Sequence, residues 1–105
     1  MEKTIITINP ENWCDDEVSV EVKTYANGTQ RFCFYDQNFT ITKPYTDKII
    51  LMDRCELKDE VGNRIALLWG TKAGWDAVES DTKYGLVISD KTPAEAAVKL
   101  ISNLY

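Results

Sequence analysis

Residues 17–35 contain the pattern that most restricts how this chain can fold. Residues 17–25 read EVSVEVKTY, in which apolar and polar side chains alternate, and residues 29–35 read TQRFCFY. Alternation with a period of two is typical of strands that bury one face. Asn27-Gly28 between the two stretches is a strong turn signal. The sequence therefore predicts a β-hairpin here.

Two registers of this hairpin are possible, and they differ in which side chains share a face. A two-residue turn would set Val22 opposite Cys33 and leave each face mixed. A three-residue loop that ends at Gly28, with this glycine in the left-handed conformation of a bulge, sets Val22 opposite Phe32 and gathers the large apolar groups on one face. We prefer this bulged register. Its cross-strand pairs are Val20–Phe34, Val22–Phe32 and Lys23–Arg31, the last a pair of like charges.

Further strands are expected on both sides of this hairpin. Residues 4–8 alternate and should pair in the same sheet. Residues 39–42 alternate again after a short turn at 36–38, and the strand should stop before Pro44, which has no amide hydrogen for a ladder. Residues 48–52 form a compact apolar run.

A second hairpin is predicted from residues 55–58 and 64–69, which flank the turn sequence DEVGN. The competing interpretation is one helix over residues 47–69, but Gly62-Asn63 would weaken its middle. Residues 74–89 repeat the hairpin pattern around a polar turn at 81–83.

The clearest helix start is Thr92-Pro93-Ala94-Glu95. Thr92 suits the N-cap, Pro93 suits the first helical position, and the Glu95 carboxylate can bond back to the cap. An apolar stripe follows at helical spacing, formed by Ala97, Leu100, Ile101 and Leu104. We therefore predict one domain over residues 1–105 of the α+β class, a mostly antiparallel β-sheet built from hairpins with one C-terminal amphipathic helix over about residues 92–104. The pattern leaves open whether the sheet is open or barrel-like.

Charge and composition restrict the function more than any motif does. The chain has no histidine, which removes the commonest general base and a common metal ligand. Its 12 basic and 17 acidic residues give a net charge of -5, which disfavours direct binding to nucleic acid. No phosphate-binding loop, nucleophile motif or informative carboxylate pair is present. We expect a protein that is not an enzyme and that has no cofactor.

The cysteines and the N-terminus indicate a compartment. Cys14, Cys33 and Cys55 are odd in number and widely spaced, so they predict neither disulfides nor a zinc site. Asp15, Asp16 and Glu17 are consecutive and lack the spacing of a calcium loop. The first residues do not resemble a signal peptide, and no apolar run is long enough to span a membrane. We expect a cytoplasmic protein with no bound metal and no membrane contact.

The remaining hypothesis is a protein-binding module. Its acidic side chains fall into groups that together could present an anionic surface to a basic partner, such as the nucleic-acid-binding groove of an enzyme. Trp69 and Trp75, which bracket the stretch GTKAG, could supply buried anchors. The predicted partner-binding residues are Asp15, Asp16, Glu17, Asp53, Glu56, Asp59, Glu60, Glu79, Asp81, Trp69 and Trp75.

In its size, its acidity and its lack of catalytic motifs, the chain resembles the small acidic proteins that phages and other mobile elements encode to inhibit host defence. These include the anti-CRISPR inhibitors of Cas9-type nucleases. The resemblance implies a phage protein that acts in the host cytoplasm as a stoichiometric inhibitor. An alternative from another class is a small-molecule or carbohydrate-binding domain that uses the aromatic residues around Trp69–Trp75.

Overall fold

The structure is a computed structural model, and it describes residues 1–8, 17–80 and 85–104. Nine strands and one helix follow one another along these residues. They are β1 (Glu2–Ile8), β2 (Val18–Thr24), β3 (Gln30–Phe34), β4 (Gln37–Ile41), β5 (Tyr45–Thr46), β6 (Asp53–Lys58), β7 (Arg64–Thr71), β8 (Gly74–Glu79), β9 (Val87–Asp90) and α1 (Pro93–Leu104). The predicted α+β class is confirmed.

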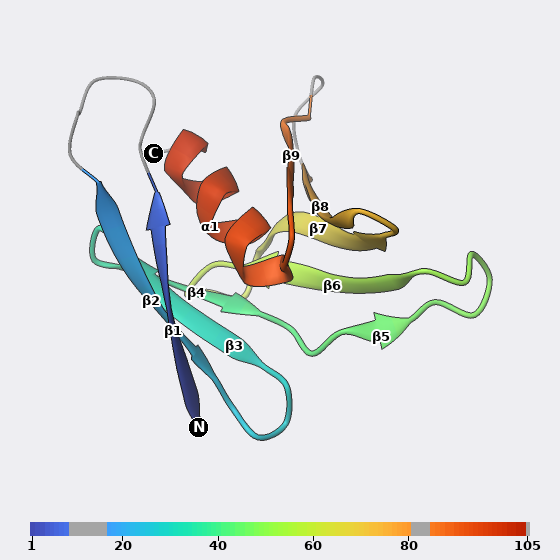
Figure 1. The fold of residues 1–105 in the computed structure, drawn as a ribbon, viewed down its shortest axis with the longest axis horizontal. Helices are drawn as coiled ribbons and strands as arrows, with labels where there is room; N and C mark the ends of the chain where they lie inside the picture. The colour runs from blue at the N-terminus through green and yellow to red at the C-terminus, as the bar shows by residue number, and fades with distance from the viewer. Residues whose placement is uncertain (9–16, 81–84, 105) are drawn as a thin grey trace.

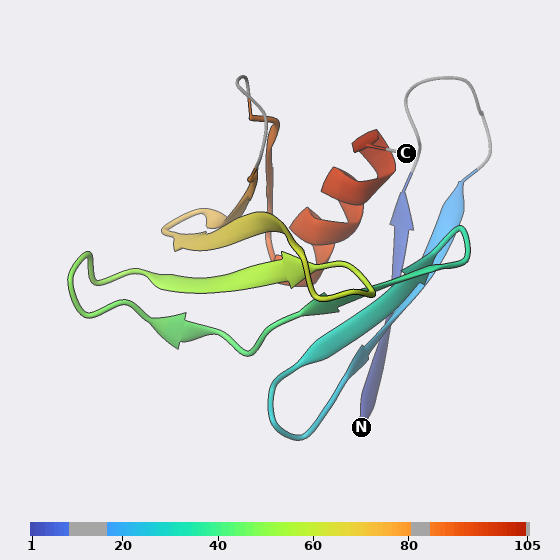
Figure 2. The same cartoon turned by 180° about the vertical axis from the view of Figure 1, so that it is seen from behind.

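All the strands belong to one antiparallel sheet, in the order β1-β2-β3-β4-β6-β7-β8-β9, with the short strand β5 paired to β6. Spatial order therefore equals chain order, as expected when each strand is joined to its neighbour by a short turn. The sheet bends so strongly that β1–β4 and β7–β9 lie on two sides of α1 (Figure 1, Figure 2). Strands β1 and β9 end the order and do not pair with each other, so the sheet is curled but open.

The helix α1 fills the concave side of this sheet. It contacts β7, β8 and β9, and also β1, β3 and β4, so one element covers both halves of the sheet. Inward side chains of the strands, among them Phe39, Ile41, Leu57 and Leu68, are fully buried beneath it. Because a helix of 12 residues is marginal alone in water, this packing is what holds it.

The first hairpin has the bulged register that the sequence predicted. Val22 pairs with Phe32 and Lys23 with Arg31. Tyr25 N donates to Thr29 O at 2.8 Å, which closes a three-residue loop whose Gly28 has φ +93°. The next turn differs slightly from the prediction, because it consists of Tyr35 and Asp36, both at positive φ, and β4 already begins at Gln37.

The second hairpin is confirmed, and residues 47–69 do not form a helix. Strands β6 and β7 pair in an antiparallel register, with Cys55 opposite Leu68 and Leu57 opposite Ala66. The apolar run at residues 48–52 is neither a strand nor part of the core, because it forms the turn between β5 and β6.

The cap of α1 is as predicted, whereas its apolar stripe is shorter. Glu95 N donates to Thr92 Oγ1 at 3.1 Å, and the Thr92 hydroxyl lies 3.3 Å from Glu95 Oε1. Ala97, Leu100 and Ile101 are fully buried, but Leu104 is 36% exposed. The sheet covers the earlier turns of the helix, and the last turn extends beyond it (Figure 1).

Candidate functional site

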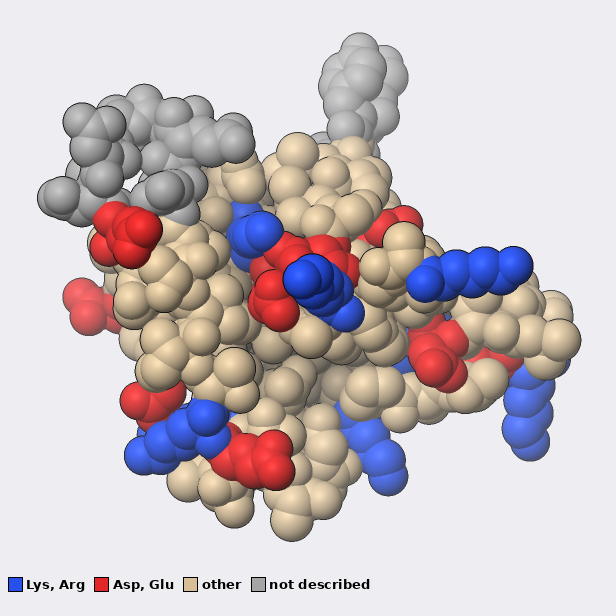
Figure 3. Space-filling model, in the orientation of Figure 1, with Lys and Arg blue, Asp and Glu red and all other residues tan. Residues whose placement is uncertain are grey.

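The predicted acidic residues occupy several parts of the molecule. Asp15, Asp16 and Asp81 lie outside the described residues. Glu17 is exposed immediately before β2. In the visible face of the space-filling view, basic side chains lie beside acidic ones, so the acidic residues there do not form an uninterrupted anionic patch (Figure 3).

Two of the predicted acids stabilise turns. Asp59 Oδ1 accepts hydrogen bonds from Val61 N at 3.0 Å and Asn63 N at 2.9 Å, which shapes the β6–β7 turn. Glu60 Oε1 accepts from the backbone and side-chain nitrogens of Asn38, at 2.7 and 3.2 Å. Glu60 thereby ties the β6–β7 turn to β4. Both carboxylates thus have structural contacts in the isolated protein.

Three more of the predicted acids are also engaged. Glu56 forms ion pairs with Lys58 at 3.7 Å and with Arg64 at 3.9 Å. Asp53 Oδ1 accepts a hydrogen bond from the Thr46 hydroxyl at 2.6 Å. Glu79 is half-buried, with Leu86 N 3.5 Å from its Oε2. These contacts orient the carboxylates without exhausting their capacity to accept further hydrogen bonds.

Trp69 and Trp75 lie on opposite faces of the sheet. Trp69 pairs with Asp76, whereas Trp75 pairs with Gly70 on the neighbouring position, and side chains at adjacent positions of a strand point in opposite directions. Trp75 packs against the core. Trp69 is outside, where the Arg54 guanidinium lies 4.7 Å from its ring centroid. The two rings therefore do not line one aromatic site.

The most exposed apolar feature is the turn between β5 and β6, which projects away from α1 (Figure 1, Figure 2). We call Ile49, Ile50 and Leu51 the apolar tip. Ile49 is 92% exposed and Leu51 is 79% exposed, and Ile50 is also exposed. Contiguous apolar side chains at the surface are typical of interaction sites.

Asp47 holds the apolar tip in one conformation. Its Oδ1 accepts hydrogen bonds from Ile49 N at 2.8 Å and Ile50 N at 3.2 Å, and Leu51 N donates to the Asp47 carbonyl at 2.8 Å. The two backbone hydrogen bonds, helped by a hydrogen bond from Arg54, keep the pKa of Asp47 below its ordinary value of 3.8. The carboxylate is therefore charged, and the turn is formed, at neutral pH.

An aromatic and cationic stack supports the base of this turn. Arg54 contacts Asp47 Oδ2 at 3.3 Å, and its guanidinium lies between the ring of Trp69, at 4.7 Å, and the ring of Tyr45, at 5.5 Å. Cation–π contacts of this kind restrain both partners. These contacts of Arg54 restrain the β5–β6 hairpin that carries the apolar tip.

Leu51 has a backbone conformation that its side chain does not favour. Its φ is +56°, in the left-handed region, where a branched side chain costs roughly 1 kcal/mol or more relative to glycine. The backbone is held in this conformation by the hydrogen bonds from Leu51 N to Asp47 O and from Asp47 N to Met52 O, but the exposed leucine side chain adds no packing that offsets the cost.

The sequence marks residues 48–52 as an apolar run but contains no motif that predicts a site there. The one feature of the sequence that could have indicated an exposed turn was the position of this run, between Pro44 and the start of a charged hairpin strand. An apolar run of five residues is equally typical of a buried strand, so its exposure was decided by the tertiary fold.

The described cysteines and carboxylates give no sign of a reactive or metal-binding centre. Cys55 is fully buried, and burial, followed by the charge of Glu56, raises the pKa of its thiol to about 12. Cys33 is exposed, and Cys14 lies outside the described residues. Within the described residues, no three Cys, Asp or Glu side chains are grouped so as to hold a metal ion.

No protein-family model matches this chain, and searches of curated proteins and of solved structures found no match. Of the part of the chain that the structure describes, no helix has both the length and the apolar character to span a bilayer.

Proposed function

We propose that this protein is a non-catalytic protein-binding module, an inhibitor or adaptor, in which the apolar tip inserts into a partner that carries a basic surface. A nucleic-acid enzyme such as a Cas9-type nuclease is the partner class we favour. The observation that carries the proposal is Leu51, an exposed leucine in a left-handed backbone conformation.

Strain of this kind indicates a role outside the fold. Glycine at position 51 would adopt the same φ with less strain and would expose less apolar surface. A leucine there gains nothing from the core, because 79% of it is exposed. Strained backbone conformations cluster at binding and catalytic sites. Contact with a partner would offset both the strain and the exposure.

The apolar tip has the character of an interface centre. Burying three aliphatic side chains that are now exposed would contribute roughly 1.5–3 kcal/mol each. Its rigid presentation by Asp47 and Arg54 lowers the entropy that binding must remove. Aliphatic anchors fill pockets, so the partner surface would contain an apolar depression.

The net charge of -5 supports the choice of a basic partner. Long-range attraction between an acidic protein and a cationic surface raises the association rate and weakens as salt screens it. A cationic nucleic-acid channel is such a surface, and an acidic inhibitor bound there would compete with the polyanion. The proposal therefore combines tip contacts, which govern dissociation, with charge, which governs association.

The test compares tip variants with a matched control elsewhere on the surface. Ile49→Ser and Leu51→Gly remove apolar area at the tip, whereas Val61→Ser removes an equally exposed apolar side chain, 83% exposed, from the β6–β7 turn. Binding to a guide-loaded Cas9-type nuclease would be measured by surface plasmon resonance at several salt concentrations. We expect each tip variant to weaken binding about tenfold or more through faster dissociation, with Val61→Ser unchanged.

Three outcomes contradict this proposal. If no variant, nor the wild type, binds the nuclease at any salt concentration, the favoured partner class is wrong. If quantitative crosslinking in host lysate then recovers the same proteins with Leu51→Gly as with Val61→Ser, the tip is not a protein-binding anchor. Binding of the wild type to zwitterionic lipid vesicles, lost in the tip variants, would assign the tip to a membrane instead.

A further inference from the structure

A row of side chains, all cationic except Thr40 on β4, crosses the outer face of the first four strands and continues onto β6. The registers pair Lys3 with Lys23, Lys23 with Arg31, Arg31 with Thr40, and Thr40 with Lys58. Neighbouring strands lie about 4.8 Å apart, so successive side chains of this row are close neighbours. Such a row is unexpected on a chain of net charge -5.

The two ends of the row are neutralised, and its centre is not. Lys3 pairs with Glu21 at 3.7 Å and Lys58 pairs with Glu56 at 3.7 Å. Neither Lys23 nor Arg31 forms an ion pair with any residue in the ranges that the structure describes. Like charges directly opposite each other destabilise a sheet. The centre of the row is therefore a place where an added anion would relieve repulsion.

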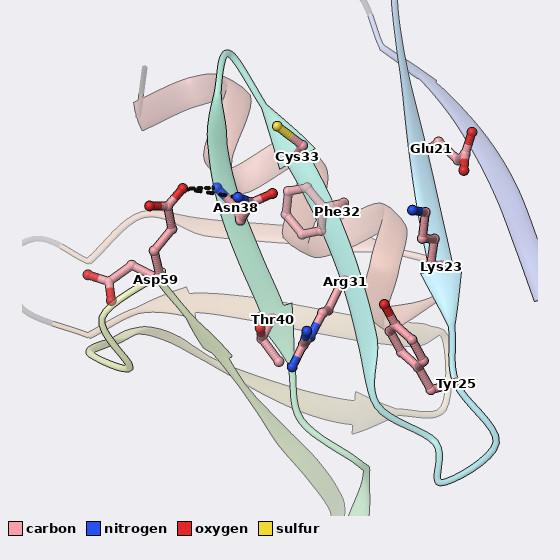
Figure 4. Close-up of a pocket in the computed structure, with 10 residues that line it drawn as sticks. Glu21, Lys23, Tyr25, Arg31, Phe32, Cys33, Asn38, Thr40 and Asp59 are labelled. Carbon is pink, nitrogen blue, oxygen red and sulfur yellow. Dashed lines mark hydrogen bonds between the residues drawn. The ribbon is translucent and has the colours of Figure 1, made fainter. Parts of the chain in front are cut away.

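These two cations line a groove on the outer face of the sheet (Figure 4). Its volume is about 640 Å³, within the range of small-molecule sites. Tyr25 and Thr40 flank the cations there and carry hydroxyl groups. The Arg31 guanidinium lies 5.6 Å from the Tyr25 ring centroid, a contact that orients it.

The acids that line the same groove already have partners. Glu21 pairs with Lys3, Asp59 accepts two backbone hydrogen bonds from its own turn, and Glu60 accepts from Asn38. They do not neutralise Lys23 or Arg31. Asp59 and Glu60 lie on the Asn38 side of the groove, whereas Lys23 and Glu21 lie on the opposite side, with Arg31 between them (Figure 4).

We propose that this groove binds a small molecule that carries a single phosphate group, held between Lys23 and Arg31. Two adjacent cations match the two charges of a phosphate monoester, and a guanidinium can donate two parallel hydrogen bonds to its oxygens. The other end of the ligand carries hydroxyl or ammonium donors that face Asp59 and Glu60. This site lies on a different surface from the apolar tip and is independent of the proposed function.

The polarity of the groove also selects one phosphate over many. A chain of phosphates that continued along the groove would meet Asp59 and Glu60, and one that continued along the row would meet lysines already paired with Glu21 and Glu56. Repulsion from these carboxylates disfavours nucleic acids and other polyanions. A phosphorylated sugar or a similar metabolite fits the arrangement.

The experiment measures phosphate binding directly. Inorganic phosphate would be titrated into the ¹⁵N-labelled protein, with sodium chloride at matched ionic strength as the reference. We expect saturable amide shift changes centred on Lys23, Tyr25, Arg31 and Thr40, and a higher melting temperature in phosphate. Lys23→Gln and Arg31→Gln should each weaken phosphate binding about tenfold. Lys72→Gln, which removes an exposed lysine from the β7–β8 turn, should leave it unchanged.

A second readout does not depend on the ligand. Because Lys23 faces two cationic neighbours, Lys23→Gln should raise the melting temperature without phosphate relative to Lys72→Gln, which changes the net charge equally. Shift changes that are the same in sodium chloride, or that survive in the Lys23→Gln/Arg31→Gln double variant, overturn the proposal. Tighter binding of heparin or an oligonucleotide than of a phosphorylated sugar overturns the choice of a monophosphate ligand.

Discussion

At the scale of single residues, the two described cysteines differ in their access to solvent. Cys55 points inward from β6, is fully buried, and has a pKa raised to about 12 by burial and by the neighbouring Glu56. The reactive form of a thiol is the thiolate, so Cys55 is inert on both counts. Cys33 points outward from β3 into the groove of Figure 4.

We therefore predict that a thiol reagent separates them. In a Cys14→Ser variant, dithionitrobenzoate should label one thiol per chain in the folded protein at neutral pH and two after unfolding in guanidinium. Cys33→Ser should abolish the native labelling, and Cys55→Ala should leave it intact. Native labelling at Cys55 would contradict the packing described here.

At the scale of elements, the turn into β8 depends on a glycine. Gly74 has φ +144°, and a Cβ built on it would overlap the Asp90 carbonyl oxygen on β9. Gly62 in the β6–β7 turn also has positive φ, +93°, but a Cβ there would meet no atom within 4 Å. An alanine at position 62 would therefore add backbone strain alone, whereas an alanine at position 74 would add both strain and steric overlap with Asp90.

We expect Gly74→Ala to lower the free energy of unfolding by roughly 2–4 kcal/mol, because β8 and β9 must separate to admit the methyl group. Gly62→Ala carries the strain alone and should cost about 1–2 kcal/mol. Urea unfolding followed by tryptophan fluorescence measures both. Equal costs would show that overlap with β9 is relieved without loss of pairing.

At the scale of the whole molecule, α1 joins the two halves of the curled sheet, and an ion pair fixes the middle of the helix to β9. The Lys99 ammonium contacts Asp90 Oδ2, and the side chains are 45% and 10% exposed. Burial by itself raises the pKa of Asp90, but hydrogen bonds from Lys99 and from Lys91 N, together with the charge of Lys99, more than offset it, so the pKa is lowered.

Lys99→Met should therefore lower the free energy of unfolding at pH 7 by about 1–2 kcal/mol, a value between those typical of exposed and of buried ion pairs. Lys99→Arg keeps the positive charge and should retain most of the wild-type stability. A carboxyl whose folded pKa is depressed contributes stability above its unfolded value, 3.8, and loses it as the pH falls through the folded value. The stability difference between wild type and Lys99→Met should thus shrink below about pH 4. Denaturant unfolding between pH 3 and 7 tests this, and a difference that stays constant would assign the loss to packing of the lysine stem.

Sequence patterns predicted the structure correctly where interactions between residues close in the chain determine it. The bulged hairpin register followed from placing Val22 beside Phe32 on one buried face and from the left-handed Gly28. The start of α1 followed from Thr92 and Pro93, since a cap needs only its own first turn. The number of acidic residues can be counted in the sequence, but the hydrogen-bond and ion-pair partners of these residues depend on the fold. Local rules could therefore not show whether the predicted acidic groups form one anionic surface.

The amino-acid sequence by itself determined most of the strands, the bulged hairpin turn and the capped helix, because alternation, turn residues and caps act within a few residues of one another. Only the tertiary structure decided that the sheet curls around α1 without closing and that the apolar run Ile49–Leu51 is exposed and not buried in the core. It also decided that Lys23 and Arg31 share a groove and form no ion pair with an acid among the described residues. These outcomes depend on which strands become neighbours and on what covers each face. Contacts between residues far apart in the chain settle both.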